Sequence, residues 1–200
     1  TGTATGLRIG GATNGALVER VTVASPGLTG VRVNEATSLT LRDVTVTGSG
    51  GAGFQFDSVN ARNYGITAQN LTATGNRSHG VLLNSFGTLA LTGGTFSGNT
   101  GSGLRAEGSF TFNLQTWRNI AAANNLQHGL DLVAGISIED STITGNRLNG
   151  INGTGGGGFT VRRTTVSDSV IGISMYFGGV TLDNVTLSGN TTGVSANTVT

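Results

Sequence analysis

The chain has no cysteine, no lysine and a single proline, and only 10% of its 200 residues are charged. Without cysteine it can form neither a disulfide framework nor a thiolate metal site. Its 11 positive charges are all arginine and 10 acids nearly cancel them, so a basic nucleic-acid-binding protein is not expected. The apolar runs are only a few residues long, which predicts no membrane insertion.

Glycine, in contrast, accounts for 35 residues, and nine of these begin a repeated pattern in which apolar residues alternate with others. Typical copies are Gly30-Val-Arg-Val and Gly129-Leu-Asp-Leu. Successive copies are separated by 24, 23, 27, 23, 26, 21, 22 and 21 residues. The nine glycines are Gly6, Gly30, Gly53, Gly80, Gly103, Gly129, Gly150, Gly172 and Gly193.

Each repeat contains two further alternating segments, such as residues 39–41 (Leu-Thr-Leu) and 44–46 (Val-Thr-Val). Alternation with β-branched residues predicts half-buried strands, and three strands in about 20 to 25 residues predict a parallel solenoid. Residues 120–123 would suit a helix in isolation, but they fall in register with residues 71–74 and are predicted to be strand. We therefore expect an all-β chain, with one solenoid domain over residues 1–200, about nine coils and three parallel sheets.

Two columns of polar residues mark the corners of this solenoid. Asn and Asp tolerate the left-handed backbone of a two-residue corner. The first column follows the second strand and contains Asp43, Asn70, Asn119, Asp140 and Asn184. A second column follows the third strand, where stacked amides can hydrogen-bond to one another, and contains Asn76, Asn99, Asn125, Asn146 and Asn190. We interpret both columns as structural.

In its repeat spacing and its Asn corners, the chain resembles the right-handed parallel β-helices of the pectin-lyase-like superfamily over almost its whole length. The resemblance implies a polysaccharide cleft on the outer face of the sheet built by the glycine-anchored strands, here called sheet one. The catalytic blocks of polygalacturonase-like enzymes are missing. Their nearest echoes are Ser78-His79-Gly80 and Gln127-His128-Gly129, without the accompanying acids. The only proline, Pro26, is not in the setting of the mannuronan-epimerase motif.

Candidate functional residues lie on the predicted outer face of sheet one. The outward column of the first strand reads Arg8, Arg32, Gln55, Leu82, Arg105, Asp131, Asn152, Ser174 and Ser195. His79 and His128 each precede a repeat glycine, and the two longest repeats insert residues 57–64 and 107–114 beside the same column. Candidate catalytic residues are Arg105, His79, His128 and Asp131. Candidate substrate-binding residues are Arg32, Gln55, Asp57, Glu107 and Asn152.

Simpler explanations compete with these roles. An ordinary cross-strand ion pair accounts for Arg105 and Asp131, and we favour it over catalysis. The two histidines are two coils apart, about 10 Å, and lack a third ligand, so we expect no metal and no other cofactor. Ca²⁺ enters only if the protein is a lyase. Aromatic residues beside an insertion either offer a sugar-stacking platform or, more commonly, seal the core. These are Trp117, Phe110 and Phe112.

Three functions fit the sequence. The first is a secreted or cell-surface scaffold or stalk whose polar face contacts a polysaccharide or cell-surface glycan. The alternative is a polysaccharide lyase or epimerase acting on uronic-acid polymers, with Arg105 or a histidine as base and Arg32 or Arg105 neutralising the uronate carboxylate. The third is suggested by Thr-x-Thr ranks on the third strands, which resemble the ice-binding face of some β-solenoid antifreeze proteins, although threonine also simply favours outward strand positions.

The first and last residues of the chain enter and leave the repeats directly, without a capping helix or polar plug. Exposed strand edges invite pairing, and natural solenoids cover them. We therefore expect a fragment of a longer solenoid whose ends are capped by neighbouring repeats or by another copy.

Overall fold

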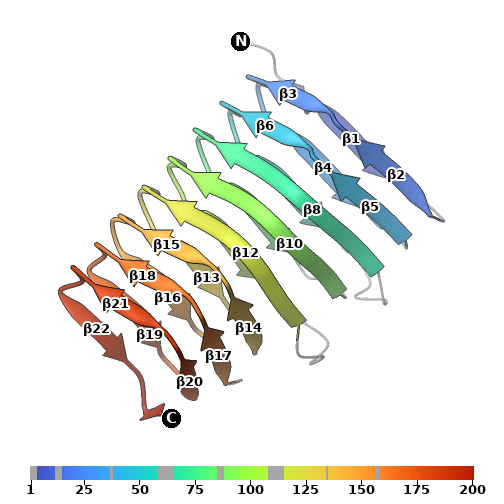
Figure 1. Ribbon diagram of the computed structural model, residues 1–200. Coiled ribbons are helices and arrows are strands. Elements are labelled where there is room, and N and C mark those ends of the chain that lie inside the picture. The colour runs from blue at the N-terminus through green and yellow to red at the C-terminus, as the bar shows by residue number, and fades with distance from the viewer. Residues whose placement is uncertain are drawn as a thin grey trace.

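The computed structural model describes residues 4–11, 15–36, 38–57, 65–84, 88–107, 115–133, 135–155 and 158–200. Over these ranges the regular structure is β-strand, and no helix could span a membrane. The strands wind into a stack of coils that advances steadily from the N-terminal to the C-terminal end (Figure 1). The predicted all-β parallel solenoid is therefore confirmed.

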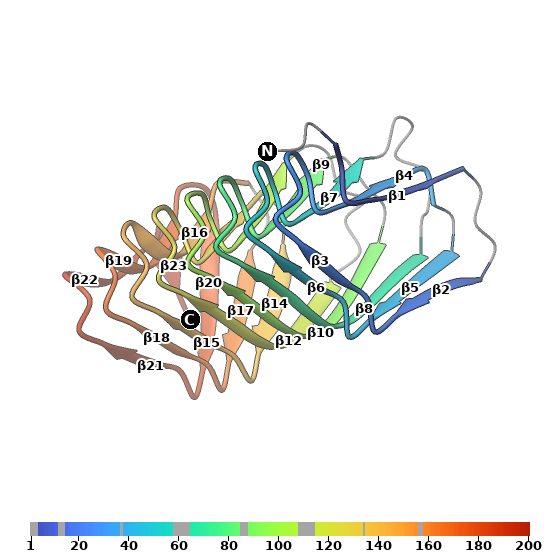
Figure 2. The ribbon, with the colours of Figure 1, turned by 90° about the horizontal axis from the view of Figure 1, so that it is seen from above.

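Sheet one forms one side of the stack (Figure 2). It consists of nine parallel strands, one from each coil, which lie in the order in which they occur along the chain. Neighbouring strands come from adjacent repeats, as the glycine spacing predicts. The strands are β1 (Leu7–Gly10), β4 (Val31–Asn34), β7 (Phe54–Asp57), β9 (Val81–Asn84), β11 (Leu104–Glu107), β13 (Leu130–Leu132), β16 (Asn149–Gly153), β19 (Ile171–Met175) and β22 (Thr192–Ser195).

The other two sides form a single bent sheet of 14 strands, where two separate sheets were predicted. Its first arm contains β2 (Ala16–Glu19), β5 (Ser38–Arg42), β14 (Ile136–Glu139), β17 (Phe159–Arg162), β20 (Gly179–Asp183) and β23 (Thr198–Val199). Its second arm contains β3 (Thr22–Ala24), β6 (Thr45–Thr47), β15 (Thr142–Thr144), β18 (Thr165–Ser167) and β21 (Thr186–Ser188). Three strands run through both arms: β8 (Gly65–Thr74), β10 (Thr88–Ser97) and β12 (Gln115–Ala123).

The arms stay joined because hydrogen bonding between coils continues around the corner. The N–H of Asp43 donates to the Gln69 carbonyl at 3.0 Å, and that of Asp140 donates to the Arg162 carbonyl at 3.1 Å. The prediction of three sheets was wrong in this respect. The number of complete turns is also slightly below the nine predicted, since β22 and β23 form only part of a winding.

The corner residues adopt the left-handed backbone that the sequence predicts. All five predicted Asn and Asp residues have φ between 51° (Asp140) and 57° (Asn119). The column also contains Arg20, Gly93 and Arg163, with φ of 54°, 71° and 45°. Arginine has no intrinsic preference for this conformation, and sequence reasoning missed both arginines. At Arg163 the guanidinium Nη2–H donates to a carboxylate oxygen of Asp140, one coil earlier, at 2.9 Å.

A continuous hydrophobic core fills the stack. Its largest fully buried side chains include Phe54, Phe56, Phe96 and Trp117. Trp117 has no exposed surface, and its indole N–H donates to the Leu89 carbonyl at 3.0 Å. It therefore seals the core and cannot serve as a sugar platform. Phe110 and Phe112 lie outside the described residues. Residues 120–123 belong to β12, so they are strand as predicted.

The second asparagine column forms a buried amide ladder. The Nδ2 of Asn76 donates to Oδ1 of Asn99 at 2.8 Å, Asn99 donates to Asn125 at 3.0 Å, and Asn125 donates to Asn146 at 2.9 Å. Each Oδ1 in this series also accepts a backbone N–H of the preceding coil. The ladder thus satisfies polar groups that a corner would otherwise leave unpaired, as predicted.

The repeat glycines are required because successive coils approach one another most closely there. A Cβ atom on Gly80 would lie 2.5 Å from the Gly103 carbonyl oxygen, and one on Gly103 would lie 2.7 Å from that of Gly129. The obstacle is backbone, which cannot rotate away as a side chain can. The repeat signal in the sequence therefore has a steric origin.

We expect Gly103→Ala to lower the free energy of unfolding by about 3 kcal/mol, because its methyl group would force backbone shifts in a packed coil. Urea denaturation followed by circular dichroism measures this. Gly65→Ala is the matched control, since a Cβ there meets nothing within 4 Å. Equal stability of the two variants would contradict the steric role of the glycine column.

Candidate functional site

The outer face of sheet one carries the predicted column in register. The pairs Arg8–Arg32, Arg32–Gln55, Gln55–Leu82, Leu82–Arg105, Arg105–Asp131 and Asp131–Asn152 are direct neighbours on adjacent strands. A second outward row lies two residues further along each strand and contains Asn34, Asp57, Asn84 and Glu107. We call the two rows together the sheet-one face.

Asp57 is the centre of one cluster on this face. Its carboxylate accepts hydrogen bonds from Nε of Arg32 at 2.8 Å, Nε2 of Gln55 at 3.0 Å and Nδ2 of Asn84 at 2.8 Å. The hydroxyl of Thr29 donates to Oε1 of Gln55 at 3.1 Å. Burial raises the pKa of Asp57, but the three donors favour its charged form and hold the pKa below the usual value. Asp57 is therefore an anion with its acceptor sites occupied.

Arg105 is the centre of a second cluster, on the next coils. Its Nε forms an ion pair with Glu107 on the same strand and lies 3.6 Å from Oδ2 of Asp131 on β13. Asn152 donates to Oδ1 of Asp131 at 2.8 Å, and Asn149 donates to Asn152 at 3.0 Å. The cross-strand pair of Arg105 and Asp131 is thus present, and hydrogen bonds from the asparagines hold the Asp131 side chain.

The histidines flank the Arg105 cluster and are fixed by backbone hydrogen bonds. Nδ1 of His79 accepts the N–H of Ser102 at 2.9 Å, and Nδ1 of His128 accepts the N–H of Asn149 at 3.2 Å. Burial is the largest effect and lowers the pKa of both imidazoles; Arg105 lowers it too, while the carboxylate of Asp131 opposes the shift without reversing it. Each is therefore a neutral ring with its proton on Nε2, so that this nitrogen is a hydrogen-bond donor and offers no lone pair.

Not all of the predicted residues meet. The structure gathers His79, Arg105, Glu107, Asp131 and His128 into mutual electrostatic contact. Arg32, Gln55 and Asp57 form the separate cluster, and the apolar Leu82 lies between the two in the outward column. Asn152 belongs to the Arg105 cluster. The predicted residues share one face, but not one site.

Sequence reasoning missed Thr29, Asn84 and Asn149, which complete the two clusters. Asn84 was detectable, because residues two apart on a strand point to the same side, and Asn84 falls in the row of Asp57 and Glu107. Thr29 and Asn149 lie outside both rows, but each stands immediately before a repeat glycine, the position that His79 and His128 occupy in other coils, so this position was the signal for them.

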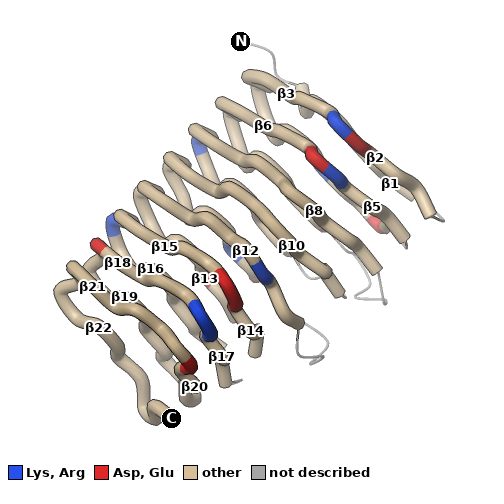
Figure 3. The backbone as a smooth tube through the Cα atoms, in the orientation of Figure 1, with Lys and Arg blue, Asp and Glu red and all other residues tan. Residues whose placement is uncertain are grey.

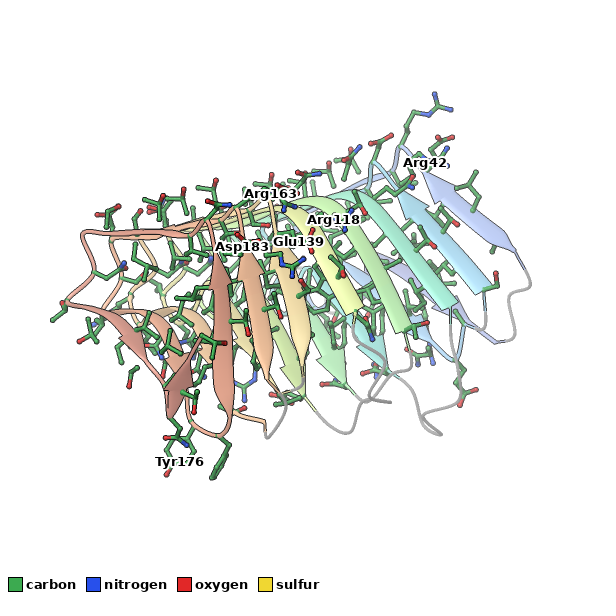
Figure 4. The ribbon with its side chains drawn as sticks, turned by 60° about the horizontal axis from the view of Figure 1, so that its bottom comes forward. Arg42, Arg118, Glu139, Arg163, Tyr176 and Asp183 are labelled. Carbon is green, nitrogen blue, oxygen red and sulfur yellow. The ribbon has the colours of Figure 1, made fainter. Side chains whose placement is uncertain are left out.

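A ridge of charged residues on the bent sheet was also missed (Figure 4). Glu139 is buried, and its Oε2 forms ion pairs with Nη2 of Arg118 at 3.1 Å and with Nη2 of Arg163 at 3.0 Å. On the same ridge Arg42 pairs with Glu19 at 3.1 Å. Each acid on this ridge is paired with an arginine of the ridge. We therefore interpret the ridge as stabilising the stack and not as a binding surface.

Among the residues that the structure describes, no three His, Asp or Glu side chains lie close enough to hold a metal ion. The absence of a cofactor remains a prediction from the sequence, as does Ca²⁺ under the lyase alternative.

A family model for the right-handed β-helix region matches residues 5–165, and the chain therefore belongs to the right-handed β-helix family. The resemblance read from the repeats is confirmed. No curated protein sequence matches the chain.

Two solved structures share the fold. The A-module of mannuronan C-5 epimerase AlgE4 from Azotobacter vinelandii superposes with a TM-score of 0.70 at 13% identity, over 92% of this chain and 63% of that one. The Agl-KA catalytic domain superposes with a TM-score of 0.70 at 16% identity, over 98% of this chain and 45% of that one. The chain thus spans less than two thirds of either structure. At these identities the likeness concerns the fold alone.

Replacing both histidines by glutamine, His79→Gln with His128→Gln, should flatten the pH dependence of stability between about pH 6.5 and pH 5. The unfolded chain binds protons in this range while the folded imidazoles resist them, so wild-type stability falls as the pH is lowered. Glutamine can still accept the backbone N–H. Urea titrations at several pH values measure the slope, and an unchanged slope in the double variant would refute the lowered pKa values.

Proposed function

We propose that the protein is a rigid β-helix that holds a polysaccharide or cell-surface glycan against the sheet-one face, outside the cell or at its surface. The observation that carries this proposal is the in-register polar side chains of the sheet-one face, whose outward column is interrupted at Leu82, where Asn84 of the second row supplies the polar group. A polymer lying along the stack meets donors and acceptors at intervals of about 4.8 Å. Such a ligand would contact Glu107, whose side chain is 45% exposed, and the Nε2–H groups of His79 and His128.

Rigidity supports the scaffold part of the proposal. Coils are linked by backbone hydrogen bonds, the amide ladder and one continuous core, so the face does not have to be ordered when a ligand binds. The fold of the mannuronan epimerase A-module adds support by analogy only, since one fold serves many functions.

Polysaccharide lyase or epimerase chemistry on uronic-acid polymers is the alternative. It requires a base near an arginine that neutralises the uronate carboxylate. Arg32 and Arg105 are already paired with Asp57 and with Glu107 and Asp131. A uronate would therefore have to displace a built-in carboxylate, and the histidines present protons. These contacts favour binding over catalysis.

Arg105→Ala should weaken polysaccharide binding about tenfold, because it removes a cation and releases Glu107 and Asp131. Isothermal titration calorimetry against alginate, polygalacturonate and dextran measures this. Arg162→Ala is the matched control, since Arg162 forms an exposed pair with Asp183 on the bent sheet, at 3.7 Å. Failure of the wild type to bind any of these polymers, or an equal loss in the control, would overturn the proposal.

The same polymers distinguish the enzymatic alternative. Ultraviolet absorbance of the unsaturated product, with and without Ca²⁺, reports lyase activity, and NMR of the uronate residues reports epimerisation. Turnover that Arg105→Ala abolishes would establish an enzyme. No turnover on any polymer, with binding retained, would leave the scaffold.

The second arm of the bent sheet supports one further candidate, ice binding. Thr45, Thr72 and Thr95 are in register on adjacent strands, as are Thr142 and Thr165. Ala121 interrupts the rank between Thr95 and Thr142. Within the second arm itself, residues 22–24, 45–47, 72–74, 95–97, 121–123, 142–144, 165–167 and 186–188 include no charged residue (Figure 3). A flat array of hydroxyl and methyl groups is the feature that an ice-binding surface needs.

We expect thermal hysteresis from the wild type under this candidate, and its loss in a Thr72→Tyr and Thr142→Tyr variant whose rings would disrupt the flat array. A nanolitre osmometer measures both. An inactive wild type eliminates ice binding without affecting the polysaccharide proposal, which concerns another side of the stack.

A further inference from the structure

An exposed aromatic pair follows β19 at the edge of the sheet-one face. Tyr176 and Phe177 are 72% and 54% exposed, and their ring centroids are 4.6 Å apart at an interplanar angle of 84°. Figure 4 shows Tyr176 projecting from the body of the stack into solvent. Every other aromatic side chain in the described ranges is at most 2% exposed; these are Phe54, Phe56, Phe96, Trp117 and Phe159.

The pair has no structural role that explains its exposure. It buries little apolar surface, so it adds little to the core. The perpendicular contact instead holds each ring against the other, which reduces the entropy that a ligand must remove when it orders them. Two adjacent aromatic residues presented to water in this way are typical of a contact site.

Backbone pairing places the rings at the end of the polar rows. The N–H of Tyr176 donates to the Gly153 carbonyl at 2.8 Å, and Gly153 is in register with Met175. Ser174 continues the outward column of Asp131 and Asn152 on the next strand. Tyr176 lies two residues after Ser174, just beyond the end of β19. The step from β13 to β19 is two coils, or about 10 Å. A polymer of a few sugars would be long enough to reach from Asp131 of the Arg105 cluster to the rings.

The surroundings decide the chemistry of the occupant. By strand register, exposed Thr154 lies one coil from Tyr176, and partly exposed Asn152 and Ser174 lie on β16 and β19 two residues earlier, so apolar rings and hydroxyl and amide groups come together at this end of the face. The other exposed large hydrophobic residues lie elsewhere, on turns that precede sheet one or on the bent sheet; these are Leu17, Leu28, Leu126, Leu148, Val170 and Val199. The rings are thus not part of a broad apolar patch of the kind that joins protein chains.

We propose that Tyr176 and Phe177 form a stacking subsite for a pyranose ring of a polysaccharide that lies along the sheet-one face. A pyranose offers an apolar C–H face to an aromatic ring and hydroxyl groups to polar neighbours, and both kinds of partner are present here. This inference rests on the proposed function, since it assigns one end of the binding surface and requires a ligand that the Arg105 cluster also contacts.

The test compares Tyr176→Ala and Phe177→Ala with Leu126→Ala, which removes a similarly exposed apolar side chain, 51% exposed, on another turn. Calorimetry with alginate, polygalacturonate and dextran measures affinity. We expect each aromatic variant to lose affinity about tenfold for the polymer that the wild type binds, and Leu126→Ala to lose none. All three should keep the wild-type thermal midpoint, because the replaced side chains are exposed.

The outcomes separate the two proposals. Suppose that the wild type binds a polymer, that Arg105→Ala weakens this binding, and that the two aromatic variants bind the polymer as tightly as the wild type does. The stacking subsite is then refuted and the proposed function stands. If the wild type binds none of the polymers, both are refuted. Sedimentation velocity completes the test. A wild-type dimer that Tyr176→Ala dissociates, with polymer affinity unchanged, would make the pair an interface between copies and overturn the sugar assignment.

Discussion

The close approach of successive coils is the constraint on which the rest of this structure depends. Parallel strands from neighbouring repeats hydrogen-bond at about 4.8 Å, and at one point in every coil the backbone of the next leaves no space for a Cβ atom. Glycine at that point fixes the registry of the stack. Once the registry is fixed, side chains one repeat apart are neighbours, and core, ladder, ion pairs and polar face all follow from that adjacency.

Much of the fold was predictable because adjacency can be read from spacing. The glycine steps predicted which strands pair, and the position of Asn99 relative to Asn76 and Asn125 predicted an amide ladder. The bent sheet was not predictable, since only backbone geometry determines whether hydrogen bonds continue through a corner. The corner positions of Arg20 and Arg163 were not predictable either, because an arginine adopts the left-handed conformation only when its surroundings require it.

The sequence was sufficient to predict which side of the stack carries the candidate residues, but not which of these residues contact one another. Alternation identifies which residues point outward, and it placed Arg32, Arg105 and Asp131 correctly. It does not say that Arg32 binds Asp57, because a long side chain selects its partner by rotamer among several neighbours in reach. The direction of the imidazoles was likewise set by backbone donors of Ser102 and Asn149, which no side-chain pattern reveals. The aromatic pair at Tyr176 could not be distinguished from core aromatics by type alone.

The turn after each sheet-one strand is the part of a coil least bound by the vertical registry. The repeats that begin at Gly53 and Gly103 are 27 and 26 residues long, against 21 to 24 for the others, and the extra length falls at this turn. The same turn carries Tyr176 and Phe177 in a later coil. Substituting residues in this turn, or lengthening it, would alter the edge of the polar face and leave the hydrogen-bonded coils and their core unchanged. Sequence change at this margin therefore has little cost in folding.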